Sequence, residues 1–389
     1  MLQKAFPRIA ATLGMLLALA ACRQQQVGVH FFAEGQPATL GEWGVLKITD
    51  GRLSLAEGVT PYDLNTPLFT DYAHKLRTIW MPKGTSARYE AENVFDFPVG
   101  TIISKTFYYP LPQAGMSKVG AWDGKSVART SPAASVLQDE TLELSKVRLV
   151  ETRLLVRRES GWIALPYVWN DAQTEATLMR TGAMLPLELV AADGEREAFT
   201  YVVPDQNQCG SCHMPDNRSR AFEPIGPKAR HLNRMFDYAG GAENQIAHLV
   251  KLGYLSDVPS DPAQIPRNAD MLDMQAPLEQ RARAYLDANC GHCHSRDGAA
   301  RTSGMWLDRA TEEPLRLGVC KQPVAAGKGT GGHLYDILPG NADGSVLVFR
   351  MESDDPGVMM PELGRSIAHR EGVALVREWI DAQHGKCDM

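Results

Sequence analysis

Hydrophobic and polar residues alternate along short segments in the first half of the chain. Val150, Thr152, Leu154 and Val156 occupy every second position, the spacing that places side chains on one face of a β-strand. Similar segments lie at 45–48, 78–81, 101–109, 161–169 and 199–203, separated by Pro, Gly, Asn and Asp. The pattern predicts an all-β antiparallel domain over residues 44–203, with its core aromatic side chains at Trp80, Tyr108, Tyr109, Trp162, Tyr167 and Trp169.

Helical spacing replaces this alternation near residue 276. A first run leads directly into Cys290 and consists of Pro277, Leu278, Arg281, Ala282, Tyr285, Leu286 and Asn289. A second run on one face, Val373, Val376, Trp379 and Ile380, predicts a helix over 366–382 that crosses the first. We therefore expect the β domain to be followed by a mostly α-helical region.

The chain begins with a basic and then an apolar segment. Lys4 and Arg8 precede an apolar run over 9–21, which is the arrangement of a secretory signal peptide and is too short to span a bilayer permanently. The run ends in Leu-Ala-Ala before Cys22, which resembles the lipobox of bacterial lipoproteins; a plain signal peptide is the alternative. Arg23 resembles the residue that directs lipoproteins to the outer membrane. The sequence thus predicts an exported protein anchored through lipid on Cys22 to the outer membrane, facing the periplasm.

The composition is that of an ordinary globular protein. Its 389 residues are 44% hydrophobic and 22% charged, and the formal net charge of -6 is spread without a long run of one sign. This length favours at least two domains, and the charge argues against a nucleic-acid partner. Gly-x-Ser-x-Gly and His-Glu-x-x-His are absent, and the Gly-rich segment 327–332 lacks the order of a phosphate loop. Hydrolase chemistry therefore has no support.

Four of the seven cysteines form two Cys-x-x-Cys-His motifs. The first is Cys209, Cys212 and His213, and the second is Cys290, Cys293 and His294. Cysteines at this spacing on a helical turn can add to the two vinyl groups of one porphyrin, while the following His reaches the iron. Zinc half-sites and redox dithiols share the Cys-x-x-Cys spacing, but two copies ending in His behind an export signal favour two covalently bound haem c groups.

The remaining cysteines are accounted for separately. Cys22 is the lipidation candidate, which leaves Cys320 and Cys387. In an oxidising compartment these two are candidates for a disulfide, and two reduced thiols are the alternative.

The second haem has a candidate distal ligand. Met360 precedes a proline well after His294, which resembles the distal-ligand loop of class I cytochromes c; Met359 is the fallback. A thioether is a soft, neutral ligand that favours reduced iron. For the first haem no motif ranks the candidates, which are His231, Met235, His248, Met271 and Met274.

These patterns predict a multidomain protein in which an N-terminal all-β antiparallel domain precedes a mostly α-helical cytochrome c-type haem region. We expect five parts: a lipoprotein signal peptide (1–21), a lipid-anchored tether (22–43), the β-rich domain (44–203), the segment of haem 1 (204–275) and a class I cytochrome c-like domain for haem 2 (276–389).

Five stretches of sequence, spread over most of the chain, resemble one bacterial protein family: 62–68, 204–213, 225–230, 281–286 and 359–365. Together they resemble a little-characterised bacterial family of di-haem c-type cytochromes, typically encoded beside a parallel β-helix repeat protein. The resemblance implies haem attachment at both motifs and a parallel β-helix protein as a candidate redox partner. It implies no substrate.

Three functions follow as hypotheses. The first is electron transfer in the cell envelope by a di-haem lipoprotein. The alternative is a haem enzyme, peroxidase-like or a dehydrogenase subunit, with catalysis at an open haem 1. The third is a binding protein whose β domain recognises a carbohydrate or a partner, with the haems as sensors.

Overall fold

The computed structural model describes residues 28–112, 122–130, 140–216, 218–324 and 327–387. The predicted signal peptide and Cys22 lie outside these residues. Among the described helices, none has the length and apolar character needed to cross a membrane.

The central element is a six-stranded sheet. Its strands follow the order β11-β10-β9-β6-β4-β3, and each neighbouring pair is antiparallel. The strands are β3 (Thr60–Tyr62), β4 (His74–Trp80), β6 (Ile102–Pro110), β9 (Val147–Arg158), β10 (Gly161–Trp169) and β11 (Ala176–Leu178). β9 is the longest strand, and Val150, Thr152, Leu154 and Val156 occupy alternate positions along it.

Smaller sheets surround the central one. One contains β1 (Leu46–Thr49), β2 (Arg52–Leu55) and β8 (Thr141–Glu143), and another contains β7 (Ser126–Ala128), β12 (Ala183–Val190) and β13 (Arg196–Val203). Two pairs complete the set: β14 (Met235–Tyr238) with β15 (Gly241–Asn244), and β5 (Ala87–Arg88) with β16 (Leu255–Ser256).

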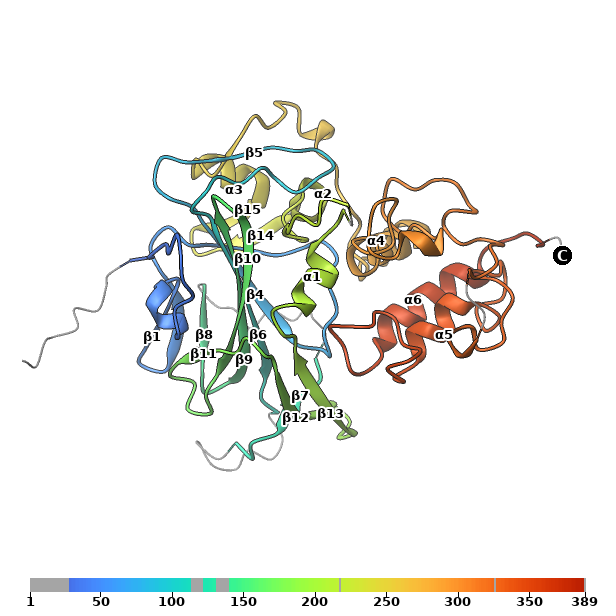
Figure 1. Cartoon of the computed structure of the whole chain (residues 1–389), viewed down its shortest axis with the longest axis horizontal. Helices are drawn as coiled ribbons and strands as arrows, with labels where there is room; N and C mark the ends of the chain where they lie inside the picture. The colour runs from blue at the N-terminus through green and yellow to red at the C-terminus, as the bar shows by residue number, and fades with distance from the viewer. Residues whose placement is uncertain (1–27, 113–121, 131–139, 217, 325–326, 388–389) are drawn as a thin grey trace, which may run out of the picture.

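Helices are short in the described part of the chain. They are α1 (Gln208–His213), α2 (Ala229–Leu232), α3 (Gln245–Lys251), α4 (Leu278–Asn289), α5 (Val346–Glu352) and α6 (Arg370–Asp381). Four 3-10 segments occur at Leu40–Trp43, Pro262–Gln264, Arg301–Ser303 and Lys328–Thr330. Figure 1 shows α4, α5 and α6 at one end, the β-sheets in the rest of the molecule, and α1 between α4 and the strands of the six-stranded sheet.

The expected fold class is wrong. The protein is mostly β, with 27% strand and 18% helix in several sheets, and the region after residue 203 is not a mostly α-helical cytochrome region. Between α4 and α5, glycines and prolines recur over 291–344, and this part of the expected α-helical region consists mostly of turns and short 3-10 segments. The purely antiparallel description also fails, because β7 pairs in parallel with β12 and β5 with β16.

Both faces of the six-stranded sheet are covered. Leu154 and Val156 belong to a core shared with Trp43 and Tyr167, and this core lies toward β1 and β2. The opposite face packs against α2, α3 and β16 at one end and against β12 and β13 at the other. The segment that follows α1 therefore folds back onto the sheet.

The helical end of the molecule has its own core. Ala282 and Leu286 of α4 pack with Val376 and Ile380 of α6, which is the crossing expected from the helical spacing. The contact is close at Gly372, where an added Cβ would lie 2.4 Å from the ring of Tyr285. A glycine is needed there because any side chain would displace the tyrosine.

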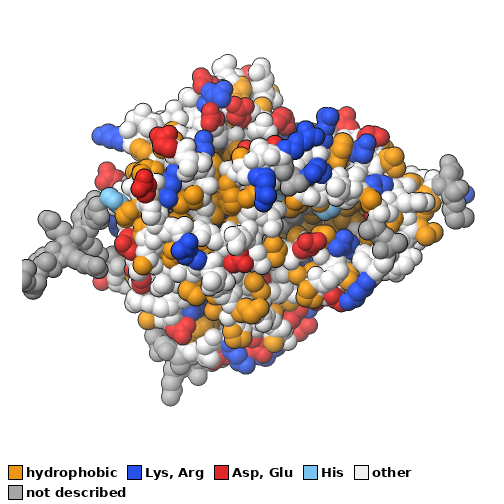
Figure 2. Space-filling model, viewed as in Figure 1, with side chains coloured by type: hydrophobic (Ala, Val, Ile, Leu, Met, Phe, Trp, Pro, Cys, Tyr) orange, Lys and Arg blue, Asp and Glu red, His pale blue; other side chains and the backbone are white. Residues whose placement is uncertain are grey.

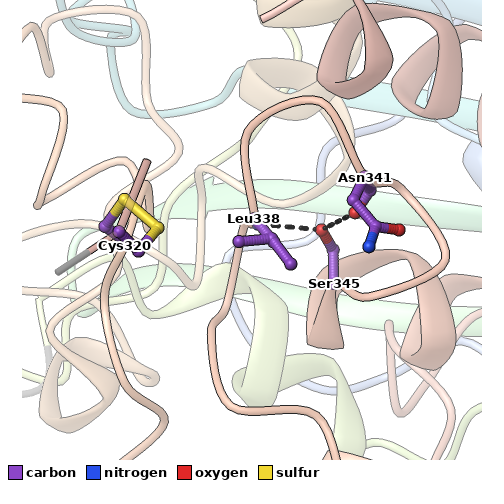
Figure 3. Close-up of a disulfide and its surroundings, with 5 residues drawn as sticks. Cys320, Leu338, Asn341 and Ser345 are labelled. Carbon is purple, nitrogen blue, oxygen red and sulfur yellow. Dashed lines mark hydrogen bonds between the residues drawn. A yellow bond between two sulfur atoms is a disulfide. The ribbon is translucent and has the colours of Figure 1, made fainter. Parts of the chain in front are cut away.

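A disulfide joins Cys320 to Cys387, with 5.2 Å between the two Cα atoms. It lies near the turn at 338–345 (Figure 3), where the Leu338 amide donates to Ser345 Oγ at 2.9 Å and the Ser345 hydroxyl donates to the carbonyl of Asn341 at 2.9 Å. The pairing considered from the sequence is thus present, and it ties the end of the chain to the loop before α5.

Replacing both Cys320 and Cys387 by Ser should lower the free energy of unfolding by about 4 kcal/mol. The disulfide closes a loop with a sequence separation of 67, and a loop of this size restricts the unfolded chain strongly. Urea unfolding of the purified protein measures the change. A loss below about 1 kcal/mol would mean that the unfolded chain gains little freedom when the crosslink is removed.

Candidate functional site

The two Cys-x-x-Cys-His motifs meet at one cavity. Its volume is about 910 Å³, within the range usual for sites that bury a small molecule or a cofactor. Cys212 lines it from the first motif, and Cys290, Cys293 and His294 line it from the second. Met360 lines the same cavity. Cys209 and His213 are not among the described residues that line it, so the first motif meets the second at this cavity through Cys212.

The first motif occupies helix α1, which directly follows β13. The carboxylate of Asp205 accepts hydrogen bonds from the amides of Asn207 and Gln208, at 2.7 and 2.9 Å, and so starts the helix. Cys209 is buried, and its thiol donates to the carbonyl of Asp205 at 3.4 Å. The strand-to-helix turn thus fixes the position of the motif against the sheet.

The second motif follows the last turn of α4. The amides of Cys290 and Gly291 both donate to the carbonyl of Leu286, at 2.8 and 2.9 Å, which closes the helix tightly. Asn289 lies beside Cys290, and its side-chain oxygen accepts a hydrogen bond from the amide of Phe69 at 2.7 Å. This contact fixes the helix end against the loop between β3 and β4.

The histidines of both motifs are held in the same way. His213 donates from Nδ1 to the carbonyl of Glu223 at 2.8 Å, and His294 donates from Nδ1 to the carbonyl of Met305 at 3.3 Å. The His213 ring also stacks on Phe222, with 5.3 Å between ring centroids. A carbonyl acceptor at Nδ1 fixes the tautomer and leaves Nε2 as the basic nitrogen, the usual arrangement of a metal-binding histidine.

Burial keeps both imidazoles neutral. It lowers the pKa of His213 to about 4, with Lys105 adding to the effect, and it lowers the pKa of His294 to about 4. Neutral imidazole is the form that coordinates a metal. Both histidines can therefore serve as iron ligands at neutral pH.

A group of three potential ligands joins the motifs. One ligand atom each of Cys212, His292 and Cys293 lies within 4.8 Å of the others. Cys293 Sγ is 3.5 Å from the carbonyl of Ser211. Interaction between the two thiol groups lowers the pKa of Cys212 and raises that of Cys293. Cys212 is therefore the more easily ionised of the two thiols.

Sequence reasoning missed His292. Its Nδ1 is buried and has no hydrogen-bond partner in the described part of the chain, although it lies at the junction of the two motifs. The signal was present in the sequence, since His292 lies between the two cysteines of the second motif. It was overlooked because the proximity of the first motif is a tertiary feature.

The methionine pair before Pro361 divides into two environments. Met360 lines the cavity together with His294, whereas Met359 is 7% exposed and is not among the described residues that line it. The backbone of Met360 is held on both sides, by its own amide donating to the carbonyl of Arg350 and by Arg365 donating to its carbonyl. The structure thus favours Met360 over Met359 as the residue that faces a bound group.

The five candidates for the distal ligand of haem 1 lie elsewhere. Among the described residues that line the cavity, none of the five occurs. His231 and Met271 are buried, Met235 and Met274 are exposed, and His248 stacks on Tyr238 and contacts Glu243. The structure does not bring any of them to the shared cavity.

Charges on the viewed face of the molecule are mixed. Figure 2 shows acidic and basic side chains interspersed over that face, with hydrophobic side chains between them. This agrees with the absence of a long single-sign run in the sequence.

The residues present fit a covalently bound haem. The cavity is large enough for a cofactor, Cys290 and Cys293 on its wall have the spacing that thioether attachment needs, and His294, which also lines it, has Nε2 as its basic nitrogen. His213 is held through Nδ1 in the same way, but it is not among the described residues that line the cavity. No protein-family model, curated protein or solved structure is significantly similar to the chain. The chemistry that this site can support therefore follows from its own residues and geometry.

Proposed function

We propose that the protein is a di-haem c-type cytochrome that transfers electrons in the cell envelope. The observation that carries the proposal is the meeting of two Cys-x-x-Cys-His motifs at one cavity of about 910 Å³. Each haem c, when bound, would accept and release one electron at its iron. Attachment points this close favour electron transfer between the two groups.

Each motif would supply the attachment residues and an iron ligand for one haem. Cys209 and Cys212 would attach haem 1, and His213 would bind its iron through Nε2. For haem 2 the attaching residues are Cys290 and Cys293. His294 would be its proximal ligand, and Met360, on the same cavity, its distal ligand. The carbonyls of Glu223 and Met305 orient the two imidazoles and raise their basicity.

Haem staining after denaturing gel electrophoresis tests this assignment. The wild-type protein should stain, and the variants Cys209→Ala/Cys212→Ala and Cys290→Ala/Cys293→Ala should each keep about half of the haem per chain, because each pair attaches one group. The variant without all four cysteines should not stain. An unstained wild-type chain, purified from a host that matures c-type cytochromes, would refute the proposal.

A haem enzyme is the alternative to a pure relay. Carbon monoxide distinguishes them, because it binds ferrous haem only where the sixth position is open or weakly held. Two low-spin haems that do not bind carbon monoxide would exclude peroxidase-like catalysis. A high-spin haem 1 that binds it would favour catalysis.

A second candidate is a metal centre formed by Cys212, His292 and Cys293, whose ligand atoms lie within 4.8 Å of one another. Two sulfurs and one imidazole suit zinc or cuprous copper. Elemental analysis distinguishes the two candidate functions. Two irons per chain support the cytochrome, whereas one zinc or copper without iron supports the Cys212, His292 and Cys293 metal centre. The cytochrome is preferred because both motifs end in a histidine whose Nε2 is left for iron.

We also propose that Cys22 carries the lipid that anchors the protein to the outer membrane on its periplasmic side. A redox partner, for which a parallel β-helix protein is one candidate, would receive or supply the electrons. The sequence of Cys22 and its neighbours supports the anchor, and the family resemblance supports the partner.

A further inference from the structure

One face of the six-stranded sheet is cationic at its middle. Residues that stand opposite one another on neighbouring antiparallel strands share a face. Two adjacent rows on this face are Arg77–Lys105–Arg153 and Lys75–Phe107–Glu151. The apolar residues of the same strands, such as Ile79, Ile103 and Leu155, continue the face toward α2 and α3. The cations are thus enclosed between hydrophobic regions.

Three of these cations surround one phenyl ring. The ammonium groups of Lys75 and Lys105 lie 5.6 and 5.3 Å from the centroid of Phe107, and the guanidinium carbon of Arg153 lies 4.4 Å from it. Contact with the ring stabilises each cation modestly, but it does not neutralise their mutual repulsion.

The carboxylates nearby do not balance these charges. The carboxylate of Glu151 accepts hydrogen bonds from Nε and Nη2 of Arg153, at 2.8 and 2.5 Å. It also accepts one from the Tyr201 hydroxyl, at 2.7 Å. Arg77 pairs with Asp63 at 2.6 Å. Lys75 donates only to the carbonyl of Ala73, and no ion pair of Lys75 or Lys105 occurs among the described residues.

The other carboxyl near Lys75 is already engaged. Asp71 accepts from the amides of Ser366 and Ile367, at 2.6 and 3.0 Å. Burial, together with the neighbouring guanidinium groups of Arg153 and Arg77, lowers the pKa of Lys105 to about 7. Partly buried cations without a counter-ion are costly, so an anion at this position would stabilise the folded protein.

The cationic face lies beside the first Cys-x-x-Cys-His motif. β13 connects the two features: the hydroxyl of Tyr201 donates to Glu151, and the chain then continues into α1, which Figure 1 shows beside the strands of the sheet.

We propose that Lys75, Lys105 and Arg153 form a binding site for a carboxylate beside the first motif. Nη1 of Arg153 and the two ammonium groups would donate to its oxygens. Two sources supply this chemistry: a propionate of haem 1, or a free carboxylate anion. The first source rests on the proposed function, and the second does not.

The test compares Lys105→Gln with Lys83→Gln, which removes an exposed lysine elsewhere on the protein. In the holoprotein, Lys105→Gln should lower the midpoint potential of haem 1, because a nearby cation favours the reduced iron. Haem 2 and the Lys83→Gln variant should keep their potentials, which also shows that the fold is intact.

Acetate distinguishes the two sources. If a propionate occupies the site, acetate leaves the potential of haem 1 in the wild-type protein unchanged. If a free carboxylate occupies it, acetate shifts that potential saturably, and Lys105→Gln abolishes the shift. Equal potentials for Lys105→Gln and Lys83→Gln, with and without acetate, would overturn the proposal.

A purified chain without haem would refute the proposed function but not this site. The melting temperature of that chain should then rise with acetate in the wild-type protein and not in Lys105→Gln. The same melting temperature in both proteins at all acetate concentrations would overturn the site as well.

Discussion

Replacing Asp287 by alanine should lower the free energy of unfolding by about 3–5 kcal/mol, because it leaves a buried guanidinium without its partner. Asp287 lies in α4 and is 5% exposed. Its carboxylate accepts from Nε and Nη2 of Arg230 at 2.8 and 3.1 Å, from the Asn268 side chain at 2.7 Å and from the Arg309 amide at 3.0 Å. These contacts join the helix that leads to the second motif to the segment that packs on the sheet.

Glu279→Ala is the matched control, because Glu279 is an exposed carboxylate in the first turn of the same helix. We expect it to change the free energy of unfolding by no more than about 0.5 kcal/mol. Urea unfolding of both variants measures the difference. Similar losses for the two variants would show that the buried pair contributes little beyond ordinary helix electrostatics.

The same network predicts acid sensitivity. Burial alone would raise the pKa of Asp287, but the charge of Arg230 lowers it well below its usual range. Burial lowers the pKa of His231, 3.7 Å from Asp287, to about 3. Both pKa values are lower in the folded state, so both groups stabilise it at neutral pH. The contribution of His231 is lost as pH falls from about 6.5, and that of Asp287 from about 4. Asp287→Ala should therefore reduce the dependence of stability on pH below about 4.

Local pattern was sufficient to predict many individual elements. The two-residue alternation of β9 and the helical spacing of α4 and α6 are carried by neighbouring residues, and they appear where those patterns place them. Assigning the other five cysteines to lipidation and haem attachment left Cys320 and Cys387 as candidates for a disulfide, and the structure joins them. Each of these features depends on residue type and spacing alone.

Assembly between distant segments was not predictable in this way. Leu255 pairs with Ala87, and β12 pairs with β7, although nothing in the local sequence of either partner specifies the other. The helical content after residue 203 was overestimated because two helical runs were extended over a region rich in glycine and proline.

The candidate site shows the same division. Its attachment residues are explicit in the two motifs, but their meeting at one cavity brings in His292, which no motif ranks. The cationic face depends on register, since Lys105 is opposite Arg77 and Arg153 only when β4, β6 and β9 pair as they do. The sequence of each strand taken alone shows charged residues, but it does not show that these residues share a face with those of the neighbouring strands.

Met360→Ala should abolish the weak sulfur-to-iron band near the red end of the ferric spectrum and lower the midpoint potential of haem 2. A thioether ligand favours reduced iron, so its loss favours the oxidised state. The substitution should leave the loop in place, because the carbonyl of Met360 accepts from Nε and Nη2 of Arg365 at 3.1 and 2.9 Å, and alanine keeps that carbonyl.

Met359→Ala is the control for Met360→Ala, since it removes a neighbouring thioether that is buried outside the described lining of the cavity. The band should persist in this variant, with haem 2 at its wild-type potential. Redox titration of the holoproteins, followed at the absorption of each haem, separates the two effects. Loss of the band in Met359→Ala but not in Met360→Ala would assign the ligand to Met359. A band unchanged in both variants would mean that neither methionine binds the iron, and that the shared cavity supplies another sixth ligand to haem 2.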